Sequence, residues 1–229
     1  MARQLRDGVW LLDLGLIPPF ATNGYLVDDG DVTLVDPGLP VNRPAVRAEL
    51  GAVGYAVGDL DRVLVTHFDL DHSGGLRGLT GDFDGPVYMG AEDLAIATGK
   101  TDPKRRHHKG LFHTLVRRLF PLPDEFAYHS VVDGDVVGQF TVYHTPGHNP
   151  GHVVFVHDSG VAFLGDLVWE ENGRLTPPFW LDSYDMRGVR ESIRDLADRA
   201  PPFNVAAMAH GDPITDGGRE ALVDCSAEL

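Results

Sequence analysis

The sequence predicts an α/β fold in which two β-sheets pack together and helices cover their outer faces. Two observations lead to this expectation. Short runs of β-branched and other apolar residues recur through the chain, and Gly, Pro or Asp bounds each run, as is typical of strands. Segments with apolar residues at helical spacing lie between some of these runs, and this alternation occurs in both halves of the chain.

The strand-like runs are short, and the early ones follow one another closely, as in hairpins. They cover residues 9–14, 24–27, 32–35, 63–66, 87–89, 140–144, 153–156, 161–164 and 205–208. One helix is expected after Pro44, with apolar positions 46, 50 and 53 on one face. Another is expected after Asp185, a candidate N-cap, with apolar positions 189, 193, 196 and 200. Residues 217–227 are expected to form a closing helix.

Residues 100–128 interrupt this pattern and are expected to form a basic helical insert or lid within a single domain spanning residues 1–229. Seven of the 19 basic residues lie between positions 100 and 118, against one acid, Asp102. They are Lys100, Lys104, Arg105, Arg106, Lys109, Arg117 and Arg118. Two interpretations stay open at this point. The segment is either a solvated basic helix or a lid that gathers anionic or amphipathic substrates over the active site.

The same segment carries apolar residues at helical spacing, so one face could press onto a pocket or a second subunit. These are Leu111, Phe112, Leu115, Val116, Leu119 and Phe120. A homodimer is therefore a possible partner arrangement. The histidines of the segment, His107, His108 and His113, are expected to be solvated.

Composition narrows the functional classes. Hydrophobic residues make up 43% of the chain, yet no run is long and apolar enough to span a membrane, and the N-terminus does not resemble a signal peptide. The only cysteine, Cys225, permits no disulfide framework, which suits a cytoplasmic protein. The net charge of −15 argues against nucleic acid as a partner, so a small-molecule substrate is expected.

The strongest local pattern is THFDLDHSGG, residues 66–75, which directly follows a predicted strand. His67 and Asp69 are two residues apart, so in an extended chain they face the same way. Asp71 and His72 follow at an expected turn, where two glycines let the backbone fold tightly. Four potential ligands within six residues predict the start of a metal site.

Three more residues of ligand type follow predicted strands: His148, Asp166 and His210. Side chains at converging strand ends commonly build active sites. If Asp69, Asp71 and Asp166 were gathered without a cation, they would repel one another. Imidazole and carboxylate groups without a thiolate suit zinc, iron or manganese.

Taken together, these motifs resemble the metallo-β-lactamase superfamily. The resemblance rests on THFDLDHSGG, HTPGHNPGH, LGD and AHGDP in this order, supported by residues 23–27 and 34–38. It implies a four-layer αβ/βα sandwich with a metal pair at one edge of the two sheets. It also implies one metal held by His67, Asp69 and His148, and another held by Asp71, His72 and His210. Asp166 would bridge them, and Asp36 would orient the loop that carries residues 67–72.

One position departs from the commonest family pattern, which has a second histidine where this chain has Asp69. A carboxylate there resembles the diiron flavoprotein branch and should favour harder ions. Asp69 is expected to bind its metal directly, with binding through water, or none, as alternatives. His144, His152 and His157 are expected to serve as core residues or to support the ligands.

The resemblance implies a hydrolase that uses two divalent ions, with zinc the first expectation and iron or manganese the alternatives. A metal-bridging hydroxide would attack, and Asp71 or Asp166 would pass a proton to the leaving group. HTPGHNPGH resembles lactonases and glyoxalase II-type thioesterases, so an ester, lactone or thioester is expected. The alternatives are a diiron or mononuclear-iron oxidoreductase and a phosphodiesterase.

Three details refine the substrate class. Lactonases of this kind carry a tyrosine where this chain has Trp169, and Tyr184 is a candidate to replace it in space. Glutathione thioesters are disfavoured, because glyoxalase II carries an added C-terminal helical region and this chain ends soon after His210. β-Lactams are disfavoured because the second site has no cysteine.

Overall fold

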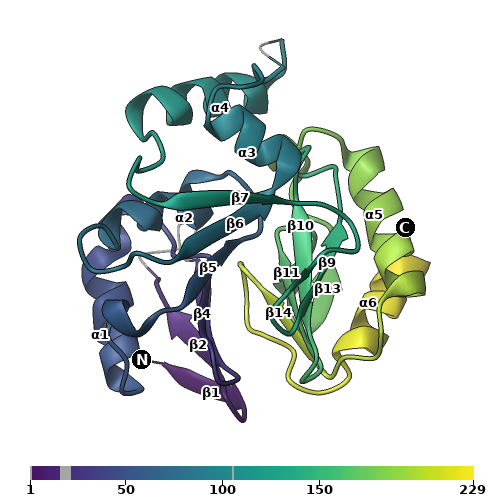
Figure 1. The fold of residues 1–229 in the computed structure, drawn as a ribbon. Helices are drawn as coiled ribbons and strands as arrows, with labels where there is room; N and C mark the ends of the chain where they lie inside the picture. The colour runs from purple at the N-terminus through teal and green to yellow at the C-terminus, as the bar shows by residue number, and fades with distance from the viewer. Residues whose placement is uncertain (1, 16–21, 105) are drawn as a thin grey trace.

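The protein is built in four layers: helices, a seven-stranded sheet, a five-stranded sheet and helices again (Figure 1). This computed structural model describes residues 2–15, 22–104 and 106–229. The arrangement confirms the predicted architecture, a four-layer αβ/βα sandwich. Arg105, one of the basic residues singled out above, lies outside the described residues.

The first sheet has the order β1-β2-β3-β4-β5-β6-β7. The strands are β1 (Arg3–Arg6), β2 (Val9–Asp13), β3 (Asn23–Asp28), β4 (Val32–Val35), β5 (Arg62–Val65), β6 (Pro86–Gly90) and β7 (Ala127–Val131). From β1 to β4 neighbouring strands are antiparallel, whereas β4 to β7 are parallel. The parallel half therefore brings several carboxyl strand ends to one edge.

The second sheet has the order β14-β11-β10-β9-β8. Its strands are β8 (Val136–Val137), β9 (Phe140–His144), β10 (Val153–His157), β11 (Val161–Gly165) and β14 (Val205–Met208). β11 and β14 are parallel, and β9 runs in the same direction because both β9 and β11 are antiparallel to β10. A separate hairpin joins β12 (Trp169–Glu171) to β13 (Arg174–Thr176).

Helices surround the two sheets. They are α1 (Arg43–Ala52), α2 (Leu70–Ser73), α3 (Ala91–Ala97), α4 (His108–Leu119), α5 (Met186–Arg199) and α6 (Gly218–Ala227), with 3-10 turns η1 (Pro40–Asn42), η2 (Val57–Asp59), η3 (Gly74–Gly78) and η4 (Trp180–Asp182). In Figure 1, α5 and α6 flank the second sheet, α1 flanks the first, and α4 lies at one end of the molecule. As predicted, Asp185 caps α5 by accepting a hydrogen bond from the Arg187 N–H at 2.9 Å.

Three clusters of buried apolar side chains correspond to the three interfaces between the layers. One lies between α1 and the first sheet, for example around Leu34 and Leu50. Another lies between the two sheets, where Phe155 and Phe163 are buried. The third lies between the second sheet and α5 and α6, around Ile193. Because successive side chains of a strand point to opposite faces, each central strand contributes to two clusters.

The predicted strand-like runs all form strands, and neither end of any strand differs from the prediction by more than one residue. Strands β1, β7, β8, β12 and β13 were not predicted. They are short or largely exposed, so they lack the continuous apolar run that identifies a buried strand. The α1, α5 and α6 helices form where they were expected. Helix α3, between Ala91 and Ala97, was not predicted.

The segment predicted to be a basic insert contains α4, and most of its apolar residues lie on the surface of this chain. Val116 is buried, whereas Leu111, Phe112, Leu115 and Leu119 are 42–58% exposed. The face that points inward carries polar residues instead, among them Lys109 and His113. The expectation that the histidines of this segment are all solvated is wrong for His113, which is fully buried.

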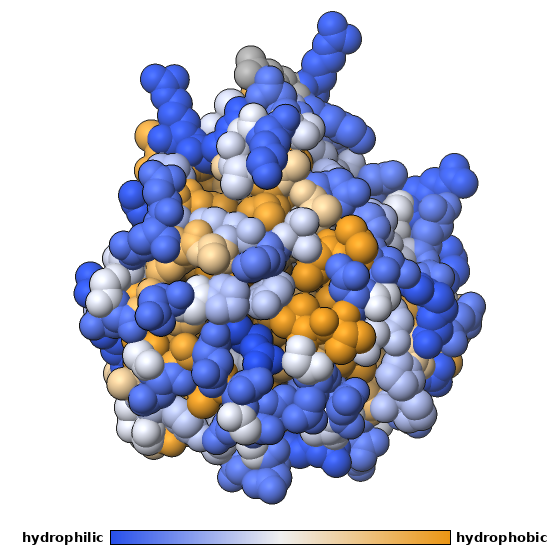
Figure 2. Space-filling view, in the orientation of Figure 1, coloured by the Kyte–Doolittle hydropathy of each residue, from blue (hydrophilic) through white to orange (hydrophobic). Residues whose placement is uncertain are grey.

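Figure 2 shows hydrophilic side chains over most of the visible face, with apolar side chains gathered toward its middle. Among the described residues, no helix combines the length and the apolar character needed to cross a membrane.

The packing between the sheets generates a stability prediction. Replacing Phe155 by alanine should lower the free energy of unfolding by about 3–5 kcal/mol, because the side chain is fully buried between the sheets. Phe179→Ala removes the same group from a site that is 53% exposed and should cost less than about 1 kcal/mol. Urea unfolding followed by circular dichroism measures both. Equal losses in the two variants would contradict this view of the core.

Candidate metal centre

The residues singled out by the sequence meet at one edge of the sandwich, at the carboxyl ends of its strands. His67 lies two residues beyond β5, Asp166 directly follows β11, and His210 lies two residues beyond β14. His148 lies in the loop between β9 and β10. The Val153 N–H donates to the Thr66 carbonyl at 2.9 Å, so the two sheets are joined by a hydrogen bond beside the site.

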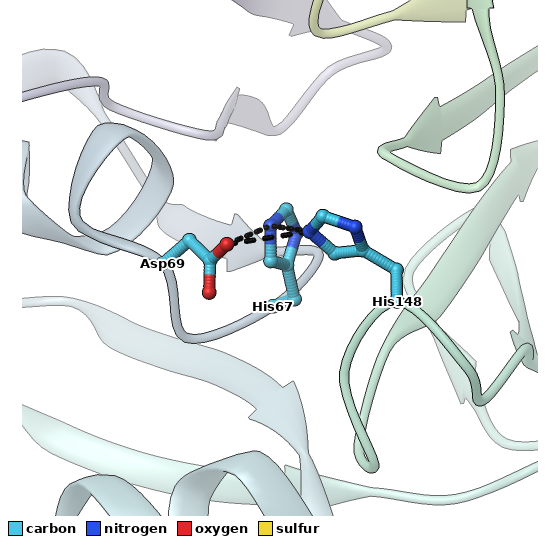
Figure 3. A group of neighbouring side chains, drawn as sticks. All are labelled: His67, Asp69 and His148. Atoms are coloured by element: carbon cyan, nitrogen blue, oxygen red, sulfur yellow. Dashed lines mark hydrogen bonds and ion pairs between the residues drawn. The ribbon is translucent and has the colours of Figure 1, made fainter. Parts of the chain in front are cut away.

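A first group of candidate ligands consists of His67, Asp69 and His148, all buried. Figure 3 shows the three side chains pointing toward one another. The Nε2 atoms of the two histidines are 3.2 Å apart, and Asp69 Oδ2 lies 3.5 Å from His67 Nε2 and 3.3 Å from His148 Nε2. Three donor atoms at these separations can surround an ion at metal–ligand distances of about 2.0–2.2 Å.

A second group consists of Asp71, His72 and His210. His210 Nε2 lies 3.5 Å from Asp71 Oδ2, and His72 Nε2 lies 3.7 Å from the same oxygen. Asp166 lies between the groups, because its Oδ2 is 3.4 Å from His210 Nε2 and 3.6 Å from His148 Nε2. The structure thus brings all seven predicted residues together, with Asp166 in reach of both groups.

Buried carboxylates fix the loops that carry these groups. Asp36 accepts hydrogen bonds from the Thr66 N–H at 2.8 Å and the Thr66 hydroxyl at 2.7 Å, and its Oδ2 lies 2.9 Å from His72 Nδ1. Asp36 therefore contacts the loop as the resemblance implied. Gly75 closes the motif tightly, since a Cβ there would lie 2.1 Å from the Pro37 carbonyl oxygen.

Asp93 has the same function between the loops that carry Asp69 and His148, although sequence reasoning did not identify it. It is fully buried and accepts hydrogen bonds from the Phe68 N–H and the Gly151 N–H, both at 2.7 Å. Asn149 Nδ2 donates both to Asp93 at 3.0 Å and to Asp69 Oδ1 at 2.9 Å. On the other side of the site, the buried His152 accepts a hydrogen bond from the Asp166 N–H at 3.1 Å, which agrees with the supporting position expected of it.

Helix α4 inserts two polar side chains that sequence reasoning did not assign to the site. Lys109 Nζ lies 2.9 Å from Asp69 Oδ2 and 2.7 Å from His148 Nε2. His113 Nε2 lies 2.7 Å from Asp69 Oδ1, and its Nδ1 is 3.0 Å from the Tyr184 hydroxyl. Lys109 and His113 are four residues apart and so share a helix face, a spacing that could have identified them.

The pKa values of the residues in and beside the second group show that its surroundings favour positive charge. Burial opposes protonation of His72, but Asp36, Asp71 and Asp166 outweigh it and raise its pKa to about 10. Burial likewise opposes protonation of His210, and Asp166 above all raises its pKa to about 11. The neighbouring histidines in turn hold the pKa of Asp166 well below its usual range, although burial alone would raise it. The buried carboxylates therefore stabilise positive charge beside them. When no metal is bound, the protonated imidazoles of His72 and His210 carry this charge.

Two buried atoms, one in the second group and one of Asp166 beside it, also fit a metal. Neither His72 Nε2 nor Asp166 Oδ1 has a hydrogen-bond partner among the described residues. A buried polar atom without a partner is costly, and a bound ion would remove that cost. The donor set of imidazoles and carboxylates suits zinc, iron or manganese.

These pKa shifts predict proton release on metal binding. Between pH 7 and 8 the metal-free protein holds His72 and His210 protonated, since their pKa values are about 10 and about 11. A metal binds the deprotonated imidazoles, so binding at this group should release about two protons, and affinity should rise with pH through this range. Calorimetric titrations in buffers of different ionisation enthalpy measure the release. Heats that do not depend on the buffer would contradict the assignment.

Comparisons with known sequences agree with this geometry. Residues 17–208 match the model of the metallo-beta-lactamase superfamily. The chain is 28% identical over 222 residues to the probable metallo-hydrolase YybB of Bacillus subtilis, covering 93% of this chain and 91% of that protein. It is 27% identical over 220 residues to the hydroxyacylglutathione hydrolase GloC of Haemophilus influenzae, covering 90% of this chain and 94% of that protein.

Solved structures give the same result. The metallo-beta-lactamase family protein TTHA1429 from Thermus thermophilus has a TM-score of 0.70 and 25% identity, covering 98% of this chain and 80% of that one. TTHA1623 in a di-iron-bound form has a TM-score of 0.65 and 26% identity, covering 90% and 96%. The resemblance drawn from the motifs is therefore confirmed, and the chain belongs to the metallo-beta-lactamase superfamily.

Proposed function

We propose that this metal-dependent hydrolase cleaves an ester, lactone or thioester bond of a small molecule at a centre of two divalent metal ions. One observation carries the proposal: two groups of candidate ligands lie side by side, and the buried carboxylate of Asp166 reaches both. Metal ions bound there would supply a hydroxide nucleophile at neutral pH and polarise the oxygen of the scissile bond.

Four aspartates would position the metal ions, transfer a proton and hold the ligand loops. Asp166 fixes the distance between the two groups, because its Oδ2 is close to His148 on one side and His210 on the other. Asp71 lies at the more open side of the site, with its side chain 29% exposed. A carboxylate in that position can pass a proton to the leaving group as it departs. Asp36 and Asp93 hold the ligand loops, so the site needs little reorganisation during the reaction.

A cavity beside Lys109 supports a substrate with an apolar part. Its volume is about 270 Å³, and it is lined by His108, Lys109, Phe112, Phe179, Leu181 and Asp182. The apolar side chains would contact an acyl group, and Lys109, which also lines the cavity, contacts the candidate ligands Asp69 and His148. Lactonases of this family carry a tyrosine at the position of Trp169. The Tyr184 hydroxyl lies 3.0 Å from His113 Nδ1 beside the site, which supports the proposal that Tyr184 takes the place of that tyrosine.

The relatives bear on the bond that is cleaved. GloC is named as a hydroxyacylglutathione hydrolase, and the alignment covers 94% of it. A protein named as a hydroxyacylglutathione hydrolase can therefore be little longer than the aligned region. Chain length thus gives no reason to disfavour glutathione thioesters, contrary to the expectation drawn from the sequence. A thioester consequently stands beside lactones and simple esters in the proposal.

An iron-dependent oxidoreductase is the second candidate, favoured by two observations. Asp69 places a carboxylate where the common pattern has histidine, and a carboxylate is a harder ligand that suits iron or manganese better than a further imidazole would. The structural neighbour TTHA1623 is named in a di-iron-bound form. Turnover of oxygen by the iron-loaded protein with an added electron donor, above the rate of the donor and iron without protein and with no hydrolysis of any tested substrate, would favour this candidate.

The hydrolase proposal predicts a large effect of Asp166→Asn. The protein loaded with zinc, iron or manganese should hydrolyse at least one member of a lactone, thioester and phosphodiester panel. The variant should lose about 100-fold or more in kcat, because one carboxylate serves both groups. Asp198→Asn changes an exposed aspartate in the same way and should leave kcat unchanged. Normal turnover in Asp166→Asn would exclude its bridging position, and cleavage of the phosphodiester alone would favour a phosphodiesterase.

A further inference from the structure

We propose that Lys109 is a tethered cation that competes with a metal ion for the group formed by His67, Asp69 and His148. The protein would then bind one metal tightly at the group of Asp71, His72 and His210. A second metal would bind only as Lys109 leaves. This inference rests on the proposed function to the extent that both groups are taken as metal sites.

The contacts of Lys109 are those of an ion bound in a site. Its side chain is 3% exposed, and the ammonium has three N–H donors. Three acceptors surround it: Asp69 Oδ2 at 2.9 Å, His148 Nε2 at 2.7 Å and the Asp182 carbonyl. Two of these three acceptors are the atoms that would bind the metal.

His148 cannot serve both cations at once. The Nε2 atom of an imidazole has a single lone pair in the ring plane, so it either accepts a hydrogen bond or binds a metal. In the structure it faces Lys109 Nζ, and its other nitrogen lies 3.4 Å from the Ser183 hydroxyl. A metal bound at Nε2 therefore requires Lys109 to move.

Asp69 leads to the same conclusion. Its Oδ1 is already engaged by His113 at 2.7 Å and by Asn149 at 2.9 Å. Only Oδ2 remains for a metal, and Lys109 lies 2.9 Å from it. A divalent ion at that oxygen would also repel the ammonium at short range.

The ion pairs that Asp71 and His72 make among the described residues are with Asp36 and with other candidate ligands, and none of them is with a lysine or an arginine. His72 Nε2 and Asp166 Oδ1 are buried and have no hydrogen-bond partner in the part of the chain that the structure describes. The two groups thus differ in one respect that bears on their order of filling: a metal at the first group must displace the ammonium of Lys109, whereas Asp71 and His72 of the second group have no lysine partner among the described residues.

A cavity beside the site has room for the Lys109 side chain after it leaves the metal ligands. Lys109 lies in the first turn of α4 and lines the cavity of about 270 Å³ next to the site. Asp182 lines the same cavity, so the ammonium can rotate toward a new anionic partner without unfolding the helix. Binding of the second metal would therefore reshape the cavity that we assign to the substrate.

The test is a zinc titration of the metal-free protein, with stoichiometry and affinity measured by competition with a chromogenic chelator. The wild type should bind one Zn²⁺ tightly and a second at least about tenfold more weakly. Lys109→Met should tighten the second by about tenfold or more, because the competing cation is gone. Lys100→Met removes an exposed lysine and should behave as the wild type. Two equally tight ions in the wild type, unchanged in Lys109→Met, would overturn the proposal.

A measurement on the wild type keeps the proposal testable if Lys109→Met does not fold. Acetylation followed by mass spectrometry should find Lys109 protected with no zinc and with one equivalent, and modified once the second ion binds. Lys100 and Lys104, both exposed, should be modified throughout and act as internal controls. Protection of Lys109 with two ions bound would show that lysine and metal coexist, which contradicts the competition.

These outcomes separate the inference from the proposed function. Failure of the wild type and of Lys109→Met to bind any zinc, iron or manganese would refute both. Equal filling of the two sites would refute the competition alone. Ordered filling that depends on Lys109, in a protein that hydrolyses no substrate of the panel, would support the competition and refute the hydrolase.

Discussion

The concentration of carboxylates at one edge of the sandwich is the constraint on which the site depends. Asp69 and Asp166 are almost fully excluded from solvent, and Asp36 is buried just behind them. Buried negative charge of this density is stable only beside positive charge. In the structure the positive charge comes from Lys109 at one group of ligands and from protonated histidines at the other. A pair of metal ions would satisfy the same demand and supply chemistry as well.

The four-layer architecture explains how so many polar groups can be held in place. The strands of both sheets end at the same edge, so short loops suffice to bring His67, His148 and His210 together. The apolar interfaces behind them keep these strand ends fixed, and polar contacts join the loops in front. Asp93 is the clearest example, because it accepts hydrogen bonds from both the Asp69 loop and the His148 loop. Apolar packing elsewhere in the fold thus offsets the cost of the buried charge.

Much of this could be predicted from the sequence, because the relevant signals are local. A ligand residue directly after an apolar strand marks an edge position, and Asp166 and His210 illustrate this. The contribution of α4 could not be predicted in this way. Lys109 and His113 lie in a run of basic residues whose composition is typical of solvated helices, and only the tertiary packing turns this face inward. The exposed apolar residues of the same helix, such as Leu115, made the opposite orientation the natural expectation.

The central claim is that the two groups of residues hold two metal ions that share Asp166. Anomalous diffraction from crystals of the zinc-loaded protein tests this most directly, because it locates each ion independently of any assumed substrate. The account predicts one peak among Asp71, His72 and His210 at low zinc. At high zinc it predicts a second peak among His67, Asp69 and His148, with Asp166 in contact with both ions. Peaks elsewhere, or none at these residues, would contradict the account.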